Sequence, residues 1–147
     1  MKFVGIFLLI LIIKCSATYH FKGQISSCST SRAKLQNIKV GFYPQYPQAG
    51  DVMKIYLNGT LSEMVTEGHV QVELYHDSIP PLKETHDLCY ILSLAEINCP
   101  LKSGPASYRF NYPLPPYIPL GNYSAKAAAT QQSNQEFFCL TARAVVQ

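Results

Sequence analysis

Five cysteines give this 147-residue sequence its clearest potential for covalent chemistry. Cys15 lies in an apolar N-terminal segment, whereas Cys28, Cys89, Cys99 and Cys139 are spread over the rest of the chain. An even number of cysteines in a secreted chain is typical of disulfide bonds. Four cysteines can pair in three ways, and the sequence alone does not choose among them.

Spacing nevertheless favours one of the three pairings. Cys89 and Cys99 are close in sequence and Pro100 follows, so a bridge between them closes one local connection. Cys28 and Cys139 would then join the first segment to the last, and closing a loop of about 110 residues stabilises a fold by roughly 4–5 kcal/mol in the chain-entropy model. Zinc is the other common use of cysteine. There is no Cys-x-x-Cys pair and the four histidines are scattered, so we expect no metal site.

Two short segments contain residue types used in hydrolysis. His76-Asp77-Ser78 holds all three members of a Ser–His–Asp triad, and His86-Asp87 holds two of them. Neighbouring residues in an extended chain point to opposite sides, so these residues cannot form the triad with one another. The sequence also lacks the glycine-containing motifs of α/β-hydrolases, P-loop proteins and dinucleotide-binding proteins. We therefore expect neither catalysis nor a cofactor.

Residues 1–17 have the pattern of a signal peptide. Lys2 precedes an apolar run from residue 3 to residue 13, and Cys15-Ser16-Ala17 supplies the small residues of a cleavage site. The run is too short to cross a hydrocarbon layer of ~30 Å. We expect cleavage after Ala17, which removes Cys15. Residues 18–147 then form one domain that is secreted or enters the endosomal or lysosomal lumen.

Removal of the leader would leave a chain with almost no net charge. Lys2 and Lys14 leave with it, so ten Lys and Arg remain against nine Asp and Glu. No basic cluster remains that could follow a phosphate backbone, so we expect no nucleic-acid partner. Weak charge argues against strong electrostatic binding to anionic membranes, although it permits transient membrane contact. We expect a monomer.

Apolar and polar residues alternate with a period of two after the leader. Prolines cluster at residues 44–47, 80–81 and 113–119, where a central strand is excluded. No segment keeps helical spacing over three turns. The pattern predicts seven strands, over residues 34–43, 51–61, 68–77, 84–95, 106–112, 122–131 and 135–146. Seven short strands indicate an all-β, immunoglobulin-like sandwich of two sheets, although the tryptophan of true immunoglobulin domains is missing.

Charged residues indicate which side of each predicted strand faces water. In the segment 84–95, this places Leu88, Tyr90, Leu92 and Leu94 inside. The last strands contribute mainly alanines to the interior, and these leave space between two sheets that pack about 10 Å apart. The sequence allows either a cavity for an apolar ligand or a core in which large residues fill the space. The cavity walls would be Val72, Leu74, Tyr90, Leu92, Tyr108, Phe110, Tyr112, Ala125, Ala127 and Leu140.

Two sequons could carry glycans in a secreted protein. They are Asn58-Gly59-Thr60 and Asn122-Tyr123-Ser124. Asn58 is expected at a strand end beside Gly59, and Asn122 at a strand start. We therefore predict both asparagines as glycosylation sites and favour Asn58.

A set of short elements, taken in chain order, resembles the ML-domain lipid-recognition family. It begins with Ser27-Cys28 and the proline-rich turn before Gly50-Asp51, and it ends with Phe137-Phe138-Cys139-Leu140. Between these lie Asn58-Gly59-Thr60-Leu61, Asp87-Leu88-Cys89, Cys99-Pro100-Leu101, Leu114-Pro115-Pro116 and Pro119-Leu120-Gly121-Asn122-Tyr123. The resemblance covers about residues 22–146. It implies a seven-stranded sandwich that holds a lipid between its sheets, with bridges Cys28–Cys139 and Cys89–Cys99.

The loop after the first predicted strand suggests a branch of that family. Sterol-carrying members of the Niemann–Pick type C kind have a further bridge there, whereas residues 42–47 contain no cysteine. The chain is therefore more similar to the phosphatidylglycerol/phosphatidylinositol transfer proteins. The resemblance implies transfer of these phospholipids between membranes. The alternatives are sterol binding or transfer, and a secreted protein that presents a lipid to a receptor.

Overall fold

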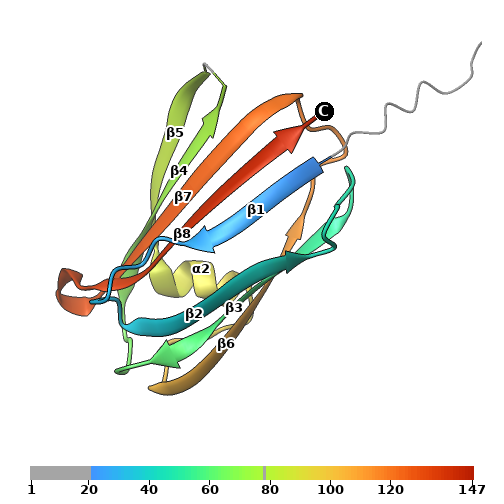
Figure 1. Cartoon of the computed structure of the whole chain (residues 1–147). Coiled ribbons are helices and arrows are strands. Elements are labelled where there is room, and N and C mark those ends of the chain that lie inside the picture. The colour runs from blue at the N-terminus through green and yellow to red at the C-terminus, as the bar shows by residue number, and fades with distance from the viewer. Residues whose placement is uncertain (1–20, 78) are drawn as a thin grey trace, which may run out of the picture.

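The computed structural model describes residues 21–77 and 79–147, which form two antiparallel sheets (Figure 1). One sheet has the strand order β1-β8-β7-β4-β5, and the other has the order β2-β3-β6. The strands are β1 (Phe21–Ser27), β2 (Leu35–Tyr43), β3 (Val52–Leu61), β4 (Gly68–His76), β5 (Ile79–Asp87), β6 (Gly104–Pro113), β7 (Gly121–Gln131) and β8 (Glu136–Val146). The predicted two-sheet sandwich is confirmed. The predicted signal peptide lies outside the described residues.

Six of the predicted strands correspond to β2, β3, β4, β6, β7 and β8. The alternating pattern does not predict β1, which pairs with β8 at the edge of the larger sheet. This strand is short and one of its inward positions is Gly23, so its apolar alternation is weak. Pro80 and Pro81 lie in β5, the other edge strand of this sheet. Proline lacks a backbone N–H, and an edge strand accommodates it because only one side of that strand pairs with a neighbour.

The predicted strand over residues 84–95 is wrong. Its first residues belong to β5, and helix α2 (Leu88–Leu94) follows. The side chain of Asp87 caps this helix by accepting a hydrogen bond from the backbone N–H of Tyr90, at 2.8 Å. Leu88 and Leu92 are buried on one face of α2. The inward orientation expected for Tyr90 and Leu94 is also wrong, because their side chains are 60% and 68% exposed on the other face.

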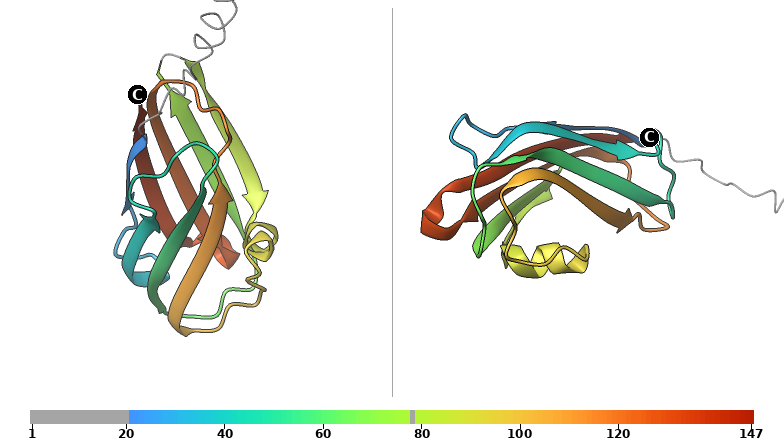
Figure 2. Two further views of the ribbon diagram at one scale, coloured as in Figure 1. Left: turned by 90° about the vertical axis from the view of Figure 1, so that its right-hand side faces the viewer. Right: turned by 90° about the horizontal axis from the view of Figure 1, so that it is seen from below.

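The hydrophobic core lies at one end of the sandwich, which we call the closed end. There the starts of β2, β4, β6 and β8 lie beside the ends of β1, β3 and β7. The residues of this core that are almost fully buried are Leu35, Leu57, Leu61, Val65, Leu88, Leu92, Ala129 and Phe137. Helix α2 covers this part by contacting β4, β5 and β7 (Figure 2). The opposite end, with the β4–β5 turn and the C-terminus, is called the open end.

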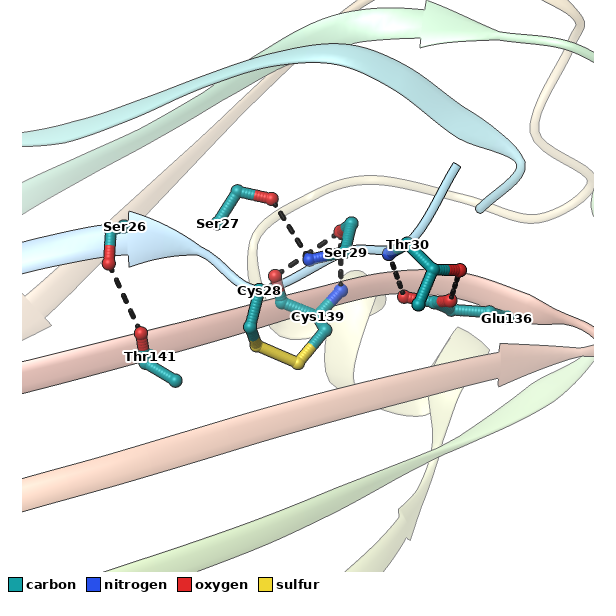
Figure 3. The surroundings of a disulfide bond; sticks show 8 residues. All are labelled: Ser26, Ser27, Cys28, Ser29, Thr30, Glu136, Cys139 and Thr141. Carbon is teal, nitrogen blue, oxygen red and sulfur yellow. Dashed lines mark hydrogen bonds between the residues drawn. A yellow bond between two sulfur atoms is a disulfide. The ribbon is translucent and has the colours of Figure 1, made fainter. Parts of the chain in front are cut away.

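Two disulfide bonds reinforce the closed end. Cys28 is bonded to Cys139, which joins the segment after β1 to β8 (Figure 3). The backbone N–H of Cys28 also donates to the carbonyl of Cys139 at 2.9 Å, so the bridge continues the strand pairing. Cys89 is bonded to Cys99, which fastens α2 to the segment that leads into β6. The predicted pairing of all four cysteines is confirmed.

Candidate functional site

Burial of the inward-facing apolar side chains decreases from the closed end to the open end along β4 and β6, whereas Val146 at the end of β8 is buried. In β4, Val70 is 5% exposed and Leu74 is 40% exposed. In β6, Tyr108 is 8% exposed and Tyr112 is 54% exposed, and the residue between each pair is half-buried. The two inner faces therefore pack against each other at the closed end and leave apolar surface uncovered towards the open end.

Strand register brings small residues together on the inner face of the larger sheet. Ala125 of β7 lies opposite Leu74 of β4, and in the next row Ala127 lies opposite Val72. On the other side of β7, Ala127 lies opposite Leu140 of β8. Half of the predicted cavity residues thus form one continuous surface in which the central strand contributes only methyl groups. Alanines at these positions would leave space above β7 unless side chains from the facing sheet fill it.

The facing wall is formed by β6. Its inner face carries Tyr108, Phe110 and Tyr112, which alternate along the strand. Tyr108 belongs to the hydrophobic core and Phe110 packs against it, and both lie opposite inward residues of β3. Burial raises the pKa of Tyr108 because ionisation would place a charge in an apolar environment. Leu92 is also inward but belongs to the packed face of α2. Tyr90 points away and cannot serve as a wall residue. Ligand contact by the remaining nine residues stays a prediction.

Exposed apolar side chains surround the open end. On the β4–β5 hairpin, Leu74 and Leu82 are paired neighbours and Ile79 lies beyond them. Similar residues lie where β2, β3 and β6 reach this end and in the loop before β7, namely Tyr43, Tyr46, Val52, Tyr112, Tyr117 and Leu120. A concentration of exposed apolar surface typically marks a site for a ligand, a partner or a membrane.

Strand β5 adds two polar residues to the otherwise apolar inner face. Glu84 lies opposite Val72, and His86 lies opposite Val70. The Nε2 atom of His86 and the Oε2 atom of Glu84 are 2.9 Å apart, and both side chains are partly exposed. The sequence pattern drew attention to His86 only through its neighbour Asp87, and not to Glu84. Its own alternation, continued back from Leu88, would have placed both inside.

At the open end, His76 and Asp77 of the segment His76-Asp77-Ser78 form a cluster with residues near the start of β7. The ring of His76 stacks on Tyr123 with 4.2 Å between ring centroids, and its Nε2 is 3.0 Å from the carbonyl oxygen of Leu120. Asp77 accepts a hydrogen bond from the backbone N–H of Asn122 at 3.0 Å. These contacts join the β4–β5 turn to the start of β7. Burial, and to a lesser extent the charge of Asp77, raises the pKa of Tyr123.

The two sequons occupy different environments. Asn58 lies within β3, the central strand of its sheet, and not at a strand end as expected. Its side-chain oxygen accepts a hydrogen bond from the hydroxyl of Ser107 at 2.8 Å. Asn122 is exposed near the start of β7, and its amide donates to Asp77. Glycosylation of either residue stays a prediction.

The outer face of the larger sheet has a hollow whose walls are polar. A hollow of about 480 Å³ lies on the outer face of the larger sheet and is lined by Glu73, Lys126 and Arg143 among others. Its charged walls do not suit an acyl chain. No group of three potential metal ligands occurs among residues 21–77 and 79–147. Within the same ranges, no helix has the length and apolar character needed to span a bilayer.

Comparison with known proteins identifies the family. The ML-domain family model matches residues 22–146, the whole of the sandwich. This chain belongs to the ML-domain family. The ML domain is 33% identical over 118 residues to a phosphatidylglycerol/phosphatidylinositol transfer protein of Emericella nidulans, covering 79% of this chain and 70% of the relative. It is 29% identical over 140 residues to a putative phosphatidylglycerol/phosphatidylinositol transfer protein 2 of Dictyostelium discoideum, covering 95% and 96%.

A solved structure supports the fold of this ML domain. Chicken MD-1, crystallised in complex with lipid IVa, superposes with a TM-score of 0.61 at 16% identity. The match covers 85% of this chain and 89% of MD-1. At this level of identity, the comparison supports the β-sandwich architecture.

Proposed function

We propose that this ML domain binds a phospholipid between its two sheets and transfers it between membranes. The observation that carries the proposal is the loss of burial along both inner faces, from Val70 to Leu74 and from Tyr108 to Tyr112. A fully packed sandwich would bury these positions evenly. Apolar surface that faces inward but is left uncovered suits acyl chains.

The mechanism would be shielding. Each CH₂ group moved from water into an apolar environment contributes about 0.8 kcal/mol. Acyl chains would lie over Ala125 and Ala127, and the headgroup would remain at the solvent-exposed edge of the gap beside β5. The exposed apolar residues at the open end would touch the membrane while the lipid enters or leaves. Contact would be transient because the chain without its predicted leader would have little net charge to hold it at an anionic surface.

The names of the relatives support phosphatidylglycerol and phosphatidylinositol as ligands. The loop at residues 43–47 contains no cysteine, which separates this chain from the sterol-carrying pattern. We further propose a secreted or lumenal protein, since two disulfide bonds persist in oxidising compartments. N-terminal sequencing of the secreted protein should give Thr18 as the first residue.

A vesicle-to-vesicle transfer assay tests the function. Donor vesicles would carry fluorescent phosphatidylinositol, phosphatidylglycerol or a labelled sterol, and acceptors would carry none. We expect the ML domain to accelerate transfer of both phospholipids well above an unrelated protein at the same concentration. Equal rates with the unrelated protein would refute transfer. Acceleration confined to the sterol would replace the phospholipid proposal with the sterol alternative.

A further inference from the structure

Glu84 and His86 form a polar pair on the wall where the proposed lipid lies. Their partners across β4 are Val72 and Val70, whose side chains carry no hydrogen-bonding group. Strand β5 is the last strand of its sheet, so the pair stands at an edge of the inner face that solvent reaches. The charged neighbours Lys83 and Glu73 occupy the opposite face of the sheet, 3.8 Å from each other.

The geometry of the pair determines what it can bind. An ionised carboxylate has no proton to donate, so the 2.9 Å contact requires the proton on Nε2 of His86. In a neutral imidazole, Nδ1 is then an acceptor. The second carboxylate oxygen, Oε1 of Glu84, is also an acceptor, and no described residue donates to either atom. While the imidazole is neutral, the pair therefore presents two acceptors, Oε1 and Nδ1, and no free donor.

We propose that Glu84 and His86 bind the hydroxyl groups of a lipid headgroup, the glycerol of phosphatidylglycerol or the inositol ring of phosphatidylinositol. Hydroxyls at different positions of the headgroup would donate to Oε1 and to Nδ1. This inference rests on the proposed function and names the part of the ligand that this wall selects. A choline headgroup has no hydrogen-bond donor and forms no hydrogen bond with the pair.

Edge protection is the competing explanation for a charged residue on the inner face of an edge strand. Inward-pointing charges discourage edge-to-edge association of sheets. In that case Glu84 would affect aggregation and have no influence on which headgroup is carried. The two explanations therefore differ in headgroup selectivity.

The main experiment compares Glu84→Gln with Glu73→Gln, a matched change on the outer face of the adjacent strand. Transfer of phosphatidylglycerol, phosphatidylinositol, phosphatidylethanolamine and phosphatidylcholine is measured at mildly alkaline pH, where imidazole groups are neutral. We expect Glu84→Gln to reduce transfer of the two hydroxyl-bearing lipids about fivefold to tenfold. Transfer of phosphatidylcholine should stay within about twofold, and Glu73→Gln should match the wild type for all four lipids.

Three outcomes would overturn the proposal. The first is an equal loss for all four lipids in Glu84→Gln, which indicates a structural effect. The second is a loss for phosphatidylethanolamine as large as that for phosphatidylglycerol, which indicates attraction of an ammonium group by the carboxylate. The third is unchanged transfer with increased aggregation, which supports edge protection.

A second measurement does not depend on transfer activity. The imidazole nitrogen resonances of the wild-type protein are followed by NMR while a water-soluble, short-chain phosphatidylinositol is added. We expect Nδ1 of His86 to shift, no shift of His69 on the outer face, and no shift of His86 with short-chain phosphatidylcholine. If His86 responds to neither lipid, the headgroup site is refuted even when vesicles show transfer. If His86 responds but vesicles show no transfer, the site stands and transfer fails.

Discussion

At the scale of single residues, Ala127 is the position where a larger side chain would test for space between the sheets. It lies in the central part of the inner face, between Val72 and Leu140, and is half-buried. Ala127→Phe would project an aromatic ring into the proposed lipid space, so we expect a folded protein with strongly reduced lipid uptake. Co-purifying lipid, measured by native mass spectrometry, provides the test. Lys126→Phe adds the same ring to the outer face and should keep its lipid. Equal lipid content in both variants would argue against the gap.

Glu63 makes the folding stability of the protein depend on pH through contacts at the closed end. Its carboxylate accepts a hydrogen bond from the buried side chain of Gln131 at 2.5 Å and lies 3.3 Å from Nζ of Lys34. The Gln131 hydrogen bond, followed by the Lys34 contact, lowers the pKa of Glu63 from its ordinary value of 4.5. A lowered pKa in the folded state means that this stabilisation is present above pH 4.5 and is lost as pH falls through the folded-state pKa.

Glu63→Gln should therefore destabilise the protein at neutral pH and matter less in acid. Chemical denaturation at a series of pH values measures the difference in unfolding free energy between variant and wild type. We expect this difference to shrink as pH falls below 4.5. A difference that stays constant with pH would show that the carboxylate contributes no charge-dependent stabilisation. The site is partly exposed, so the effect should be modest.

At the scale of elements, α2 shows why alternation misleads over a short segment. Leu88 and Leu92 are four residues apart, a spacing that places side chains on one face of both a strand and a helix. Tyr90 distinguishes the two, because it shares that face in a strand and leaves it in a helix. The capping side chain of Asp87 was the available signal for a helix start. The position of Glu84 and His86 opposite Val72 and Val70 was not predicted, because neighbours across a sheet cannot be known without the register.

Alanine substitutions on the two faces of α2 test this assignment. Leu92→Ala removes a buried side chain and should lower the unfolding free energy by about 2–5 kcal/mol. Tyr90→Ala removes a larger but exposed side chain and should change it by no more than about 0.5 kcal/mol. Equilibrium denaturation of the two variants gives both values. Comparable losses would mean that Tyr90 is inward, as the strand interpretation required.

At the scale of the whole molecule, the sequence predicted the sandwich and the cysteine pairing but not where the sheets separate. Alternation defines the inner face of each strand separately, and cysteine spacing defines which distant segments meet. The gradient from Val70 to Leu74 depends on how far apart two complete sheets lie, and no local pattern encodes that distance. Alternation identified Ala125 and Ala127 as inward residues, yet only the facing sheet decides whether space remains over them.

The two disulfide bonds should stabilise the molecule unequally, because they close loops of very different length. Cys28 and Cys139 are 111 residues apart, whereas Cys89 and Cys99 are 10 apart. In the chain-entropy model, removing the long-range bridge costs about 2 kcal/mol more than removing the local one. Denaturation of the double variants Cys28→Ser/Cys139→Ser and Cys89→Ser/Cys99→Ser measures the difference. A larger loss for the local pair would show that holding α2 in place matters more than restricting the unfolded chain. Both bridges lie at the closed end, away from Leu74 and Tyr112, so variants that remain folded should retain bound lipid.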